Sequence, residues 1–189
     1  MGNMENTFRK ICAPFDDHTA RSLKAGESVL VSGSILAARD AAHKRLCECL
    51  DRGAPLPVDL RGQVVYYVGP SPARPGHIIG AAGPTTSGRM DAYTPRLIEH
   101  GLKGMIGKGY RSQEVVSAMK MHGVPYLAAV GGAGALIART IKSYTVLAWP
   151  ELGPEALATM EVVNFPAIVV IDSNGEDFYR SGQAPYRTL

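Results

Sequence analysis

Cysteine is scarce in this sequence of 189 residues, which contains three, and their number and places argue against two kinds of protein. An odd count is poorly suited to a disulfide framework. Cys47 and Cys49 lie two positions apart in a segment that reads as a helix, so their side chains point about 200° apart and do not readily share a metal ion. We therefore expect Cys12, Cys47 and Cys49 to be reduced structural thiols, with no metal site on this chain.

Long apolar runs and a strong net charge are also missing. No segment approaches the ~20 apolar residues that span a bilayer, and residues 1–6 lack the basic and apolar regions of a secretory signal. Asn6 stands where a myristoylation signal would have Ser or Thr. The net charge is only +3 and the Lys and Arg residues are scattered, which does not suit a nucleic-acid surface. We expect a cytoplasmic protein with neither a membrane nor a nucleic-acid partner.

Complete nucleotide and hydrolase motifs are absent as well. Gly83 and Gly88 are spaced as in a P-loop, but Arg89 and Met90 follow where that motif needs Lys and a magnesium-binding Ser or Thr. The glycines near residue 132 lack the third glycine of a dinucleotide fingerprint. No Gly-x-Ser-x-Gly elbow and no zinc-ligand spacing occurs. The sequence therefore does not favour an NTPase, a dinucleotide-binding enzyme, a serine hydrolase or a zinc enzyme.

Alternating strand and helix patterns fill the chain. Apolar runs bounded by glycine and proline predict strands at residues 28–34, 64–68, 77–82, 103–107, 126–130, 145–149 and 167–172. Helical spacing and capping residues predict helices at 38–52, 91–100, 112–122, 135–142 and 154–161. Residues 1–26 are expected to form a strand and a turn. The alternation implies a three-layer α/β sheet with crossover helices, in a single domain over residues 1–189 with a loosely ordered polar tail at 180–189.

Residues 83–90 (GPTTSGRM), which we call the donor loop, are the most distinctive stretch present. The loop lies between a predicted strand and a predicted helix, and Thr85, Thr86 and Ser87 place three hydroxyls beside Arg89. Small residues, hydroxyls, a guanidinium and the start of a helix together form a favourable environment for an anion. The same residues also suit an ordinary turn and helix N-cap, so the pattern alone leaves both interpretations open.

Two further cations stand at predicted element ends, where ligands bind open α/β sheets. These are Arg39 and Lys108, and His43 lies one helical turn from Arg39, facing either a ligand or solvent. Planar guanidinium groups match carboxylates in two-point contacts. A small dicarboxylate or a phosphate is therefore the ligand favoured by the full set of donors: Arg39, Thr85, Thr86, Ser87, Arg89 and Lys108.

Several ordered stretches resemble one enzyme family. Residues 83–91 (GPTTSGRMD) resemble the signature of the iron–sulfur class I fumarases, in their C-terminal domain or separate beta subunit. Residues 38–45 (ARDAAHKR), 106–109 (IGKG), 128–133 (AAVGGA) and 165–172 (FPAIVVID) are similar to further stretches of that family. Motifs that agree in order and spacing are far more specific than a single glycine-rich loop.

The resemblance implies a swivelling β/β/α fold and a hydro-lyase of the tricarboxylic acid cycle that interconverts fumarate and malate. It implies a [4Fe–4S] cluster held by a partner alpha subunit, because the three cysteines of this chain do not match cluster spacing. The chain would then be the beta subunit of a hetero-oligomer and inactive by itself. L-tartrate dehydratase and mesaconate hydratase beta subunits are close alternatives, and a stand-alone module that binds a dicarboxylate or phosphate is an alternative of another class.

The resemblance also implies roles for individual residues. Arg39 and Arg89 would bind the substrate carboxylates, with Lys108 as a further substrate contact and Thr86 and Ser87 as additional donors. Thr85 would be the catalytic base, although a threonine hydroxyl needs a strong cationic field to act as one. The alternative is that Thr85 only positions the substrate and that the base lies on the alpha subunit.

Overall fold

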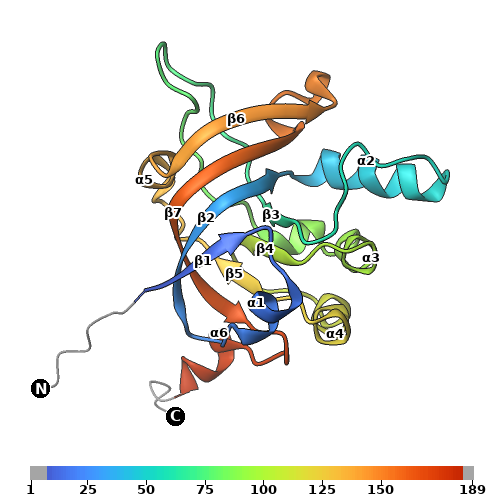
Figure 1. Ribbon diagram of the computed structural model, residues 1–189, viewed down its shortest axis with the longest axis vertical. Helices are drawn as coiled ribbons and strands as arrows, with labels where there is room; N and C mark the ends of the chain where they lie inside the picture. The colour runs from blue at the N-terminus through green and yellow to red at the C-terminus, as the bar shows by residue number, and fades with distance from the viewer. Residues whose placement is uncertain (1–7, 185–189) are drawn as a thin grey trace, which may run out of the picture.

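The computed structural model describes residues 8–184 and shows a mixed α/β fold (Figure 1). The strands are β1 (Arg9–Ala13), β2 (Ser28–Ala37), β3 (Val64–Tyr66), β4 (Gly104–Gly107), β5 (Tyr126–Ala128), β6 (Ile141–Ala148) and β7 (Leu157–Ile171). The α-helices are α1 (Asp17–Ser22), α2 (Asp40–Asp51), α3 (Thr94–Glu99), α4 (Gln113–His122), α5 (Gly134–Ala138) and α6 (Phe178–Ser181). Two 3₁₀ helices complete the list, η1 (Ser87–Met90) and η2 (Pro150–Glu155). No helix within this part of the chain is both long enough and apolar enough to cross a membrane.

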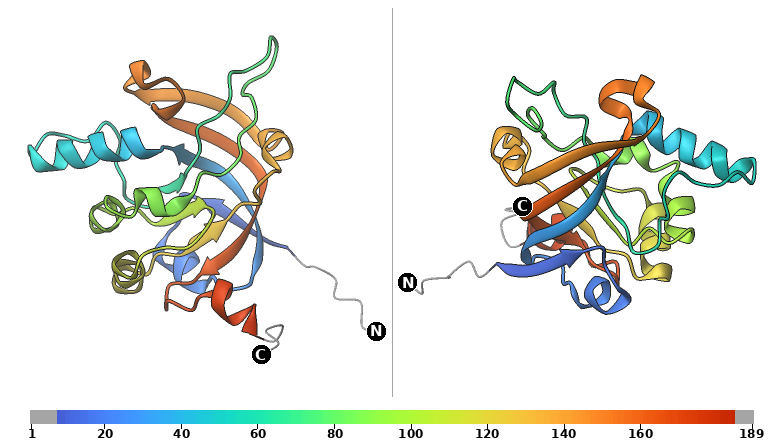
Figure 2. Two further views of the ribbon diagram at one scale, coloured as in Figure 1. Left: turned by 180° about the vertical axis from the view of Figure 1, so that it is seen from behind. Right: turned by 45° about the horizontal axis from the view of Figure 1, so that its top comes forward.

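The sheet closes on itself through its longest strand. The strand order is β1-β2-β3-β4-β5-β7-β6, and β2 also pairs with β7. Strands β1 to β5 run parallel to their neighbours, whereas β7 is antiparallel to β2, β5 and β6. Because β7 pairs with both β2 and β5, the strands from β2 to β5 form a continuous curved wall, which is visible from both sides in Figure 2.

Two hydrophobic cores lie on opposite faces of the parallel strands. Val64 and Tyr66 of β3 belong to a core enclosed by strands, whereas Val65 and Tyr67 belong to a core shared with α2, α3 and α4. Figure 1 shows these three helices together on one side of the sheet. Successive strand residues point to opposite faces, so burial of both faces produces the continuous apolar runs from which these strands were predicted.

Most of the predicted elements are confirmed. The strands at 28–34, 64–68, 103–107 and 126–130 correspond to β2, β3, β4 and β5, and those at 145–149 and 167–172 lie within or largely within β6 and β7. The helix predicted at 38–52 is α2. The helix predicted at 112–122 is α4, where Ser112 caps the start by accepting a hydrogen bond from the Val115 N–H at 3.4 Å and Gly123 ends the helix with a positive φ.

Residues 77–82 do not form a strand, and this prediction was wrong. They belong to an irregular segment that leaves β3 and returns as the donor loop, and we call residues 71–81 the projecting loop (Figure 1). The base of the projecting loop is closed by hydrogen bonds from the Ser71 N–H to the Ala81 carbonyl and from the Ala81 N–H to Ser71 Oγ, at 3.0 and 2.8 Å. The apolar run Ile78–Ile79 therefore lies in a loop that has no partner strand.

The helices predicted at 154–161 and 135–142 were also wrong in part. Residues 157–161 are the start of β7, and η2 before them is interrupted at Gly153, which has a φ of 55°. Alanine, leucine, methionine and glutamate favour helices, but pairing with β2 and β6 overrides that preference here. Helix α5 ends at Ala138, and Ile141 already belongs to β6.

The two ends of the chain differ from the predictions in detail. Residues 1–26 contain the expected strand, β1, but also the helix α1, which starts at Asp16 through a hydrogen bond from the Thr19 N–H to its side chain at 2.7 Å. At the other end, Arg180 and Ser181 lie in α6, so the predicted tail begins inside a short helix. Residues 1–7 and 185–189 are outside the described residues.

Candidate active site

The donor loop lies where three parallel strands end. Strands β2, β3 and β4 are neighbours, so their carboxyl ends lie at the same edge of the sheet. Pro84 pairs with Val68 after β3, and Thr86 pairs with Lys108 after β4. The Thr85 N–H donates to the Tyr67 carbonyl at 2.7 Å, and the Ser87 N–H donates to the Lys108 carbonyl at 2.9 Å. These bonds fix the donor loop across the ends of β3 and β4.

Arg39 reaches this edge from the end of β2. It occupies the N-cap of α2, and its Nη2 lies 3.5 Å from Glu155 Oε1. The guanidinium passes over Gly69, where an added Cβ would come within 2.4 Å of Nη1. A larger residue at position 69 would therefore displace the Arg39 side chain from this position.

Asp40 joins the two arginines of the site. Its Oδ1 accepts a hydrogen bond of 2.9 Å from Arg89 Nε, and its Oδ2 lies 3.8 Å from Arg39 Nε. Within residues 8–184, Arg39 Nε and Asp40 Oδ2 are the buried side-chain polar atoms without a hydrogen-bond partner. Buried polar groups normally have partners; these two atoms lie 3.8 Å apart, so they attract each other electrostatically but are too far apart for a direct hydrogen bond and too close for another group to lie between them. The Arg89 side chain is 50% exposed, and Asp40 holds only its Nε.

The hydroxyls of the donor loop differ in their surroundings. Thr85 is half-buried and Thr86 is exposed, whereas Ser87 is buried. Thr86 occupies the N-cap of η1 but its side chain makes no capping hydrogen bond, so the capping interpretation of the Thr-Thr-Ser stretch is not what the structure shows. The helix predicted from residue 91 begins only at Thr94, after the four-residue η1. The dipole of a long helix therefore does not point at the donor loop.

Ser87 is part of a buried hydrogen-bonded chain. The Lys108 N–H donates to Ser87 Oγ at 3.1 Å. Ser87 Oγ donates to the Tyr126 hydroxyl at 2.8 Å, because the Tyr126 hydroxyl itself donates to the Gly109 carbonyl at 3.0 Å. Burial raises the pKa of Tyr126, which keeps that hydroxyl a donor. This chain fixes the backbone on both sides of Lys108.

Arg111 lies behind the site and was not singled out by the sequence. Its side chain is fully buried, and its Nε donates to Asp91 Oδ1 at 2.8 Å. The guanidinium carbon lies 5.3 Å and 5.1 Å from the ring centroids of Tyr67 and Tyr126. Asp91 Oδ2 accepts a bond of 2.6 Å from the Ser112 N–H. The Arg111–Asp91 pair therefore ties the residue after the donor loop to the loop that follows β4.

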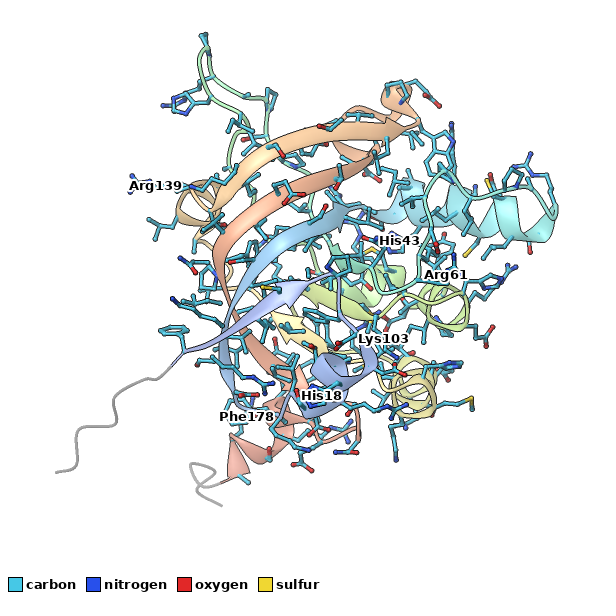
Figure 3. The ribbon with its side chains drawn as sticks, in the orientation of Figure 1. His18, His43, Arg61, Lys103, Arg139 and Phe178 are labelled. Atoms are coloured by element: carbon cyan, nitrogen blue, oxygen red, sulfur yellow. The ribbon has the colours of Figure 1, made fainter. Side chains whose placement is uncertain are left out.

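His43 is buried and contacts the backbone of Arg39. The side chain is buried, and its Nδ1 lies 2.8 Å from the Arg39 carbonyl, so this nitrogen carries a proton and donates it (Figure 3). The ring packs edge-on against Tyr67, with 5.3 Å between centroids. The pKa of His43 is lowered to about 4, chiefly by burial and in smaller part by the nearby Arg111 charge, while the Arg39 hydrogen bond and the Asp40 charge oppose the shift. His43 is therefore neutral at pH 7.

The cysteines do not form a ligand set for a metal cluster. Cys47 is buried on α2, where its Sγ lies 3.9 Å from the Tyr93 carbonyl, while Cys49 is partly buried and Cys12 is exposed on β1. Among residues 8–184 no group of three His, Cys, Asp or Glu side chains is arranged to hold a metal ion. The residues described here do not fit an iron–sulfur cluster.

The structure is thus a mixed α/β domain that carries the donor loop and Arg39 at the carboxyl edge of its parallel strands. A sequence profile of the family described as "Fumarase C-terminus" matches residues 10–182. Fumarate hydratase 2 of Leishmania major is 43% identical over 156 residues, covering 82% of this chain and 28% of that protein. The aerobic class I fumarate hydratase of Escherichia coli K12 is 42% identical over 155 residues, covering 81% of this chain and 28% of that protein.

A relative of similar length also exists. A Methanocaldococcus jannaschii protein, provisionally named an L(+)-tartrate dehydratase subunit beta, is 37% identical over 182 residues, covering 93% of this chain and 91% of that protein. The chain therefore belongs to the fumarase C-terminus family of class I fumarate hydratases and tartrate dehydratase beta subunits, and is of the beta-subunit type. It spans about 28% of the fumarate hydratases that it matches. The family resemblance drawn from the motifs is confirmed.

We predict that Arg111→Met destabilises the isolated chain by about 3–5 kcal/mol, because it leaves the Asp91 carboxylate without its partner in a low-dielectric environment. Urea unfolding at pH 7 measures the change. Arg61→Met is the matched control, since it breaks an exposed pair with Asp59 and should cost at most about 1 kcal/mol. Equal losses in the two variants would show that burial of the Arg111–Asp91 pair is unimportant.

We predict that His43 makes the chain less stable in acid. The unfolded state binds a proton near pH 6.5 and the folded state only near pH 4, so stability is complete above pH 6.5 and falls towards pH 4 by about 3 kcal/mol. His43→Gln cannot titrate, so its stability deficit relative to the wild type should shrink across this window in pH-dependent urea unfolding. In the control His100→Gln, which removes an exposed histidine with the same type of bond to the Arg96 carbonyl, the change should be smaller. A deficit of His43→Gln that stays constant would contradict the prediction.

Proposed function

We propose that this chain is the beta subunit of an iron–sulfur-dependent hydro-lyase that reversibly hydrates fumarate to malate at a site shared with an alpha subunit. The observation that carries the proposal is the arrangement of Arg39, Asp40 and Arg89 beside Thr85 and Lys108 at one edge of the sheet. The names of the relatives support the reaction class. L-tartrate dehydratase and mesaconate hydratase beta subunits remain the alternatives within it.

The proposed partner is an alpha subunit that holds the iron–sulfur cluster. The [4Fe–4S] cluster of the proposed enzyme is held by the alpha subunit, because the cysteines here do not form a cluster site. Relatives about three times as long carry the corresponding segment within one chain, and a relative of similar length is named as a subunit. The same proposal includes a cytoplasmic location, a single domain over residues 1–189 and the three-layer swivelling β/β/α arrangement, which the two cores on opposite sheet faces support.

The cations bind and orient a dicarboxylate in this proposal. Asp40 holds Arg89 by Nε only, so the paired Nη groups of Arg89 remain available for a two-point contact with one carboxylate. Arg39 contacts the second carboxylate through its Nη groups, while its buried Nε stays beside Asp40 Oδ2 at 3.8 Å. Lys108 adds a positive charge, and Thr86 adds an exposed hydroxyl. Ser87 is a positioning residue, because its buried hydroxyl holds Lys108 and Tyr126.

Thr85 is the proposed proton-transfer residue. In malate formation its hydroxyl gives a proton to the carbon that becomes the methylene group, and in the reverse direction the alkoxide takes that proton back. A threonine alkoxide is accessible only where positive charge stabilises it. Lys108, adjacent to the donor loop through the Thr86–Lys108 bridge, and Arg89 supply that field. The alternative is that Thr85 orients the substrate and a residue of the alpha subunit transfers the proton.

A stand-alone module for a dicarboxylate or phosphate is the second candidate, motivated by the donor loop and its cations alone. Such a module would bind its ligand tightly without a partner. The two functions differ in a single measurement, since calorimetry of the isolated chain with fumarate, malate and phosphate reports affinity directly. Micromolar binding by the isolated chain would favour the module.

We predict that the isolated chain does not hydrate fumarate and that turnover appears when the cluster-carrying alpha subunit is added without oxygen. The absorbance of fumarate measures the rate. Parallel assays with tartrate and mesaconate identify the substrate of the reconstituted enzyme. Robust turnover by the isolated chain would contradict the shared site.

We predict that Arg89→Lys lowers kcat/KM of the reconstituted enzyme by roughly 30- to 900-fold, which corresponds to about 2–4 kcal/mol. An ammonium group cannot replace a two-point guanidinium contact. Arg96→Lys is the control, since Arg96 also forms an exposed ion pair, with Asp51, but lies outside the donor loop. Unchanged kinetics in Arg89→Lys would remove Arg89 from the carboxylate contacts.

A further inference from the structure

A cavity of about 630 Å³ lies between the projecting loop and the α5–β6 segment, away from the residues that we assign to substrate. Its cationic lining residues are Arg74, Arg139 and Lys142, and none of its lining residues is Asp or Glu. The projecting loop extends past α5 and the nearby end of β6 (Figure 1), and Arg139 points outward from α5 below the tip of the loop (Figure 3). We call this cavity the basic groove.

No carboxylate balances the cations of the basic groove. The groove is lined by Arg74, Arg139 and Lys142 and by no Asp or Glu. Most arginines in residues 8–184 are paired with carboxylates: Arg9, Arg39, Arg45, Arg52, Arg61, Arg89, Arg96, Arg111 and Arg180. Arg74 and Arg139 make no ion pair with a carboxylate in that range, so the groove presents uncompensated positive charge.

The basic groove also has apolar surfaces, which suit a polypeptide better than a small ion. Ile79 and Ile141 are buried within it, while Ile78 on the projecting loop is 52% exposed. On α5, Leu136 lies between the lining residues Ala135 and Ala138 in sequence, and its side chain is 62% exposed. Exposed apolar side chains beside charged ones are typical of the surfaces through which proteins associate.

The basic groove is joined to the candidate active site through the backbone. The Ala82 N–H donates to the Gly134 carbonyl at 3.0 Å, and a Cβ added at Gly134 would meet Gly83 N at 2.9 Å. Gly134 begins α5, whereas Ala82 and Gly83 lead directly into Pro84 and Thr85 of the donor loop. A segment bound in the groove would press the projecting loop against α5 at the place where the chain enters the active site.

We propose that the basic groove receives an acidic segment, carrying apolar side chains, of the alpha subunit that completes the active site. The inference rests on the proposed function. In the fumarate hydratases that this chain matches over 28% of their length, the remaining sequence belongs to the same protein, so a large partner surface must be accommodated on this domain. Complementary charge identifies the groove as the contact that guides the alpha subunit to the open side of the site.

The test compares the affinity of the full chain for the alpha subunit before and after charge reversal. Fluorescence anisotropy of the labelled chain gives Kd at 50 and 300 mM salt. The double variant Arg74→Glu with Arg139→Glu should raise Kd by about 10- to 100-fold at low salt, with the effect shrinking at high salt. The double variant Arg74→Lys with Arg139→Lys should retain most of the affinity, because it keeps the charge.

The matched control reverses two cations at the other end of the molecule. Arg21 and Lys24 are exposed and make no ion pair with a carboxylate in residues 8–184, and α1 lies far from the projecting loop in Figure 1. Arg21→Glu with Lys24→Glu changes the net charge equally and should alter Kd by less than about threefold. Thermal unfolding of each variant confirms that the fold is intact.

Each outcome supports or overturns the inference. Equal effects in the groove and control variants, or none in either, would overturn it, as would a wild-type chain that fails to associate with the alpha subunit. Binding of inorganic pyrophosphate to the free chain, lost in the Arg74/Arg139 variant while Kd for the alpha subunit is unchanged, would show a small-anion site instead. Association through the groove without any hydration of fumarate would leave the inference standing and refute the proposed function.

Discussion

The structure depends on one buried charge, the guanidinium of Arg111. Removing such a group from water costs several kcal/mol, so it persists only with close partners. Here those partners are the Asp91 carboxylate, the rings of Tyr67 and Tyr126, and Thr94 Oγ1, which accepts a bond of 2.9 Å. Tyr67 contacts both Arg111 and His43, and His43 bonds to the Arg39 carbonyl. Tyr126 contacts both Arg111 and Ser87, and Ser87 accepts from the Lys108 N–H. These connected buried side chains therefore support the backbone of Arg39 and of Lys108.

This support explains how like charges are held close together at the site. Arg39, Arg89 and Lys108 repel one another, and a flexible surface would let them separate. Asp40 and Glu155 compensate part of the charge of the two arginines. Arg39 Nε and Asp40 Oδ2 lie 3.8 Å apart, too far for a hydrogen bond, so this part of the compensation is by charge alone. The backbone of the site is thus fixed, while the half-exposed Arg89 keeps Nη groups that Asp40 does not bind, an arrangement that favours binding of an anionic ligand.

The sequence predicted the parts of this arrangement that depend on local pattern. Apolar runs bounded by glycine and proline revealed β2 to β5, helical spacing and caps revealed α2 and α4, and the donor loop stood out by composition. Interactions between residues far apart in the chain could not be predicted from local sequence patterns. Residues 157–161 carry helix-forming side chains, yet they pair with β2, and residues 77–82 are apolar without a partner strand. Arg111 and Asp91 looked like ordinary charges, because only the fold brings the loop after β4 against the donor loop.

The same geometry explains why this chain is expected to be half of an enzyme. In the proposed enzyme, Arg39 and Arg89 bind carboxylates that bear the same charge in the substrate and in the transition state, so their binding energy would be largely uniform and would accelerate the reaction mainly by orientation. Rate acceleration also requires groups that respond to charge developing where bonds change. On this chain Thr85, with Lys108 and Arg89 near it, is the proposed group for the carbon that gains or loses a proton. In the proposed enzyme, the cluster of the alpha subunit would supply the Lewis acid for the departing hydroxyl.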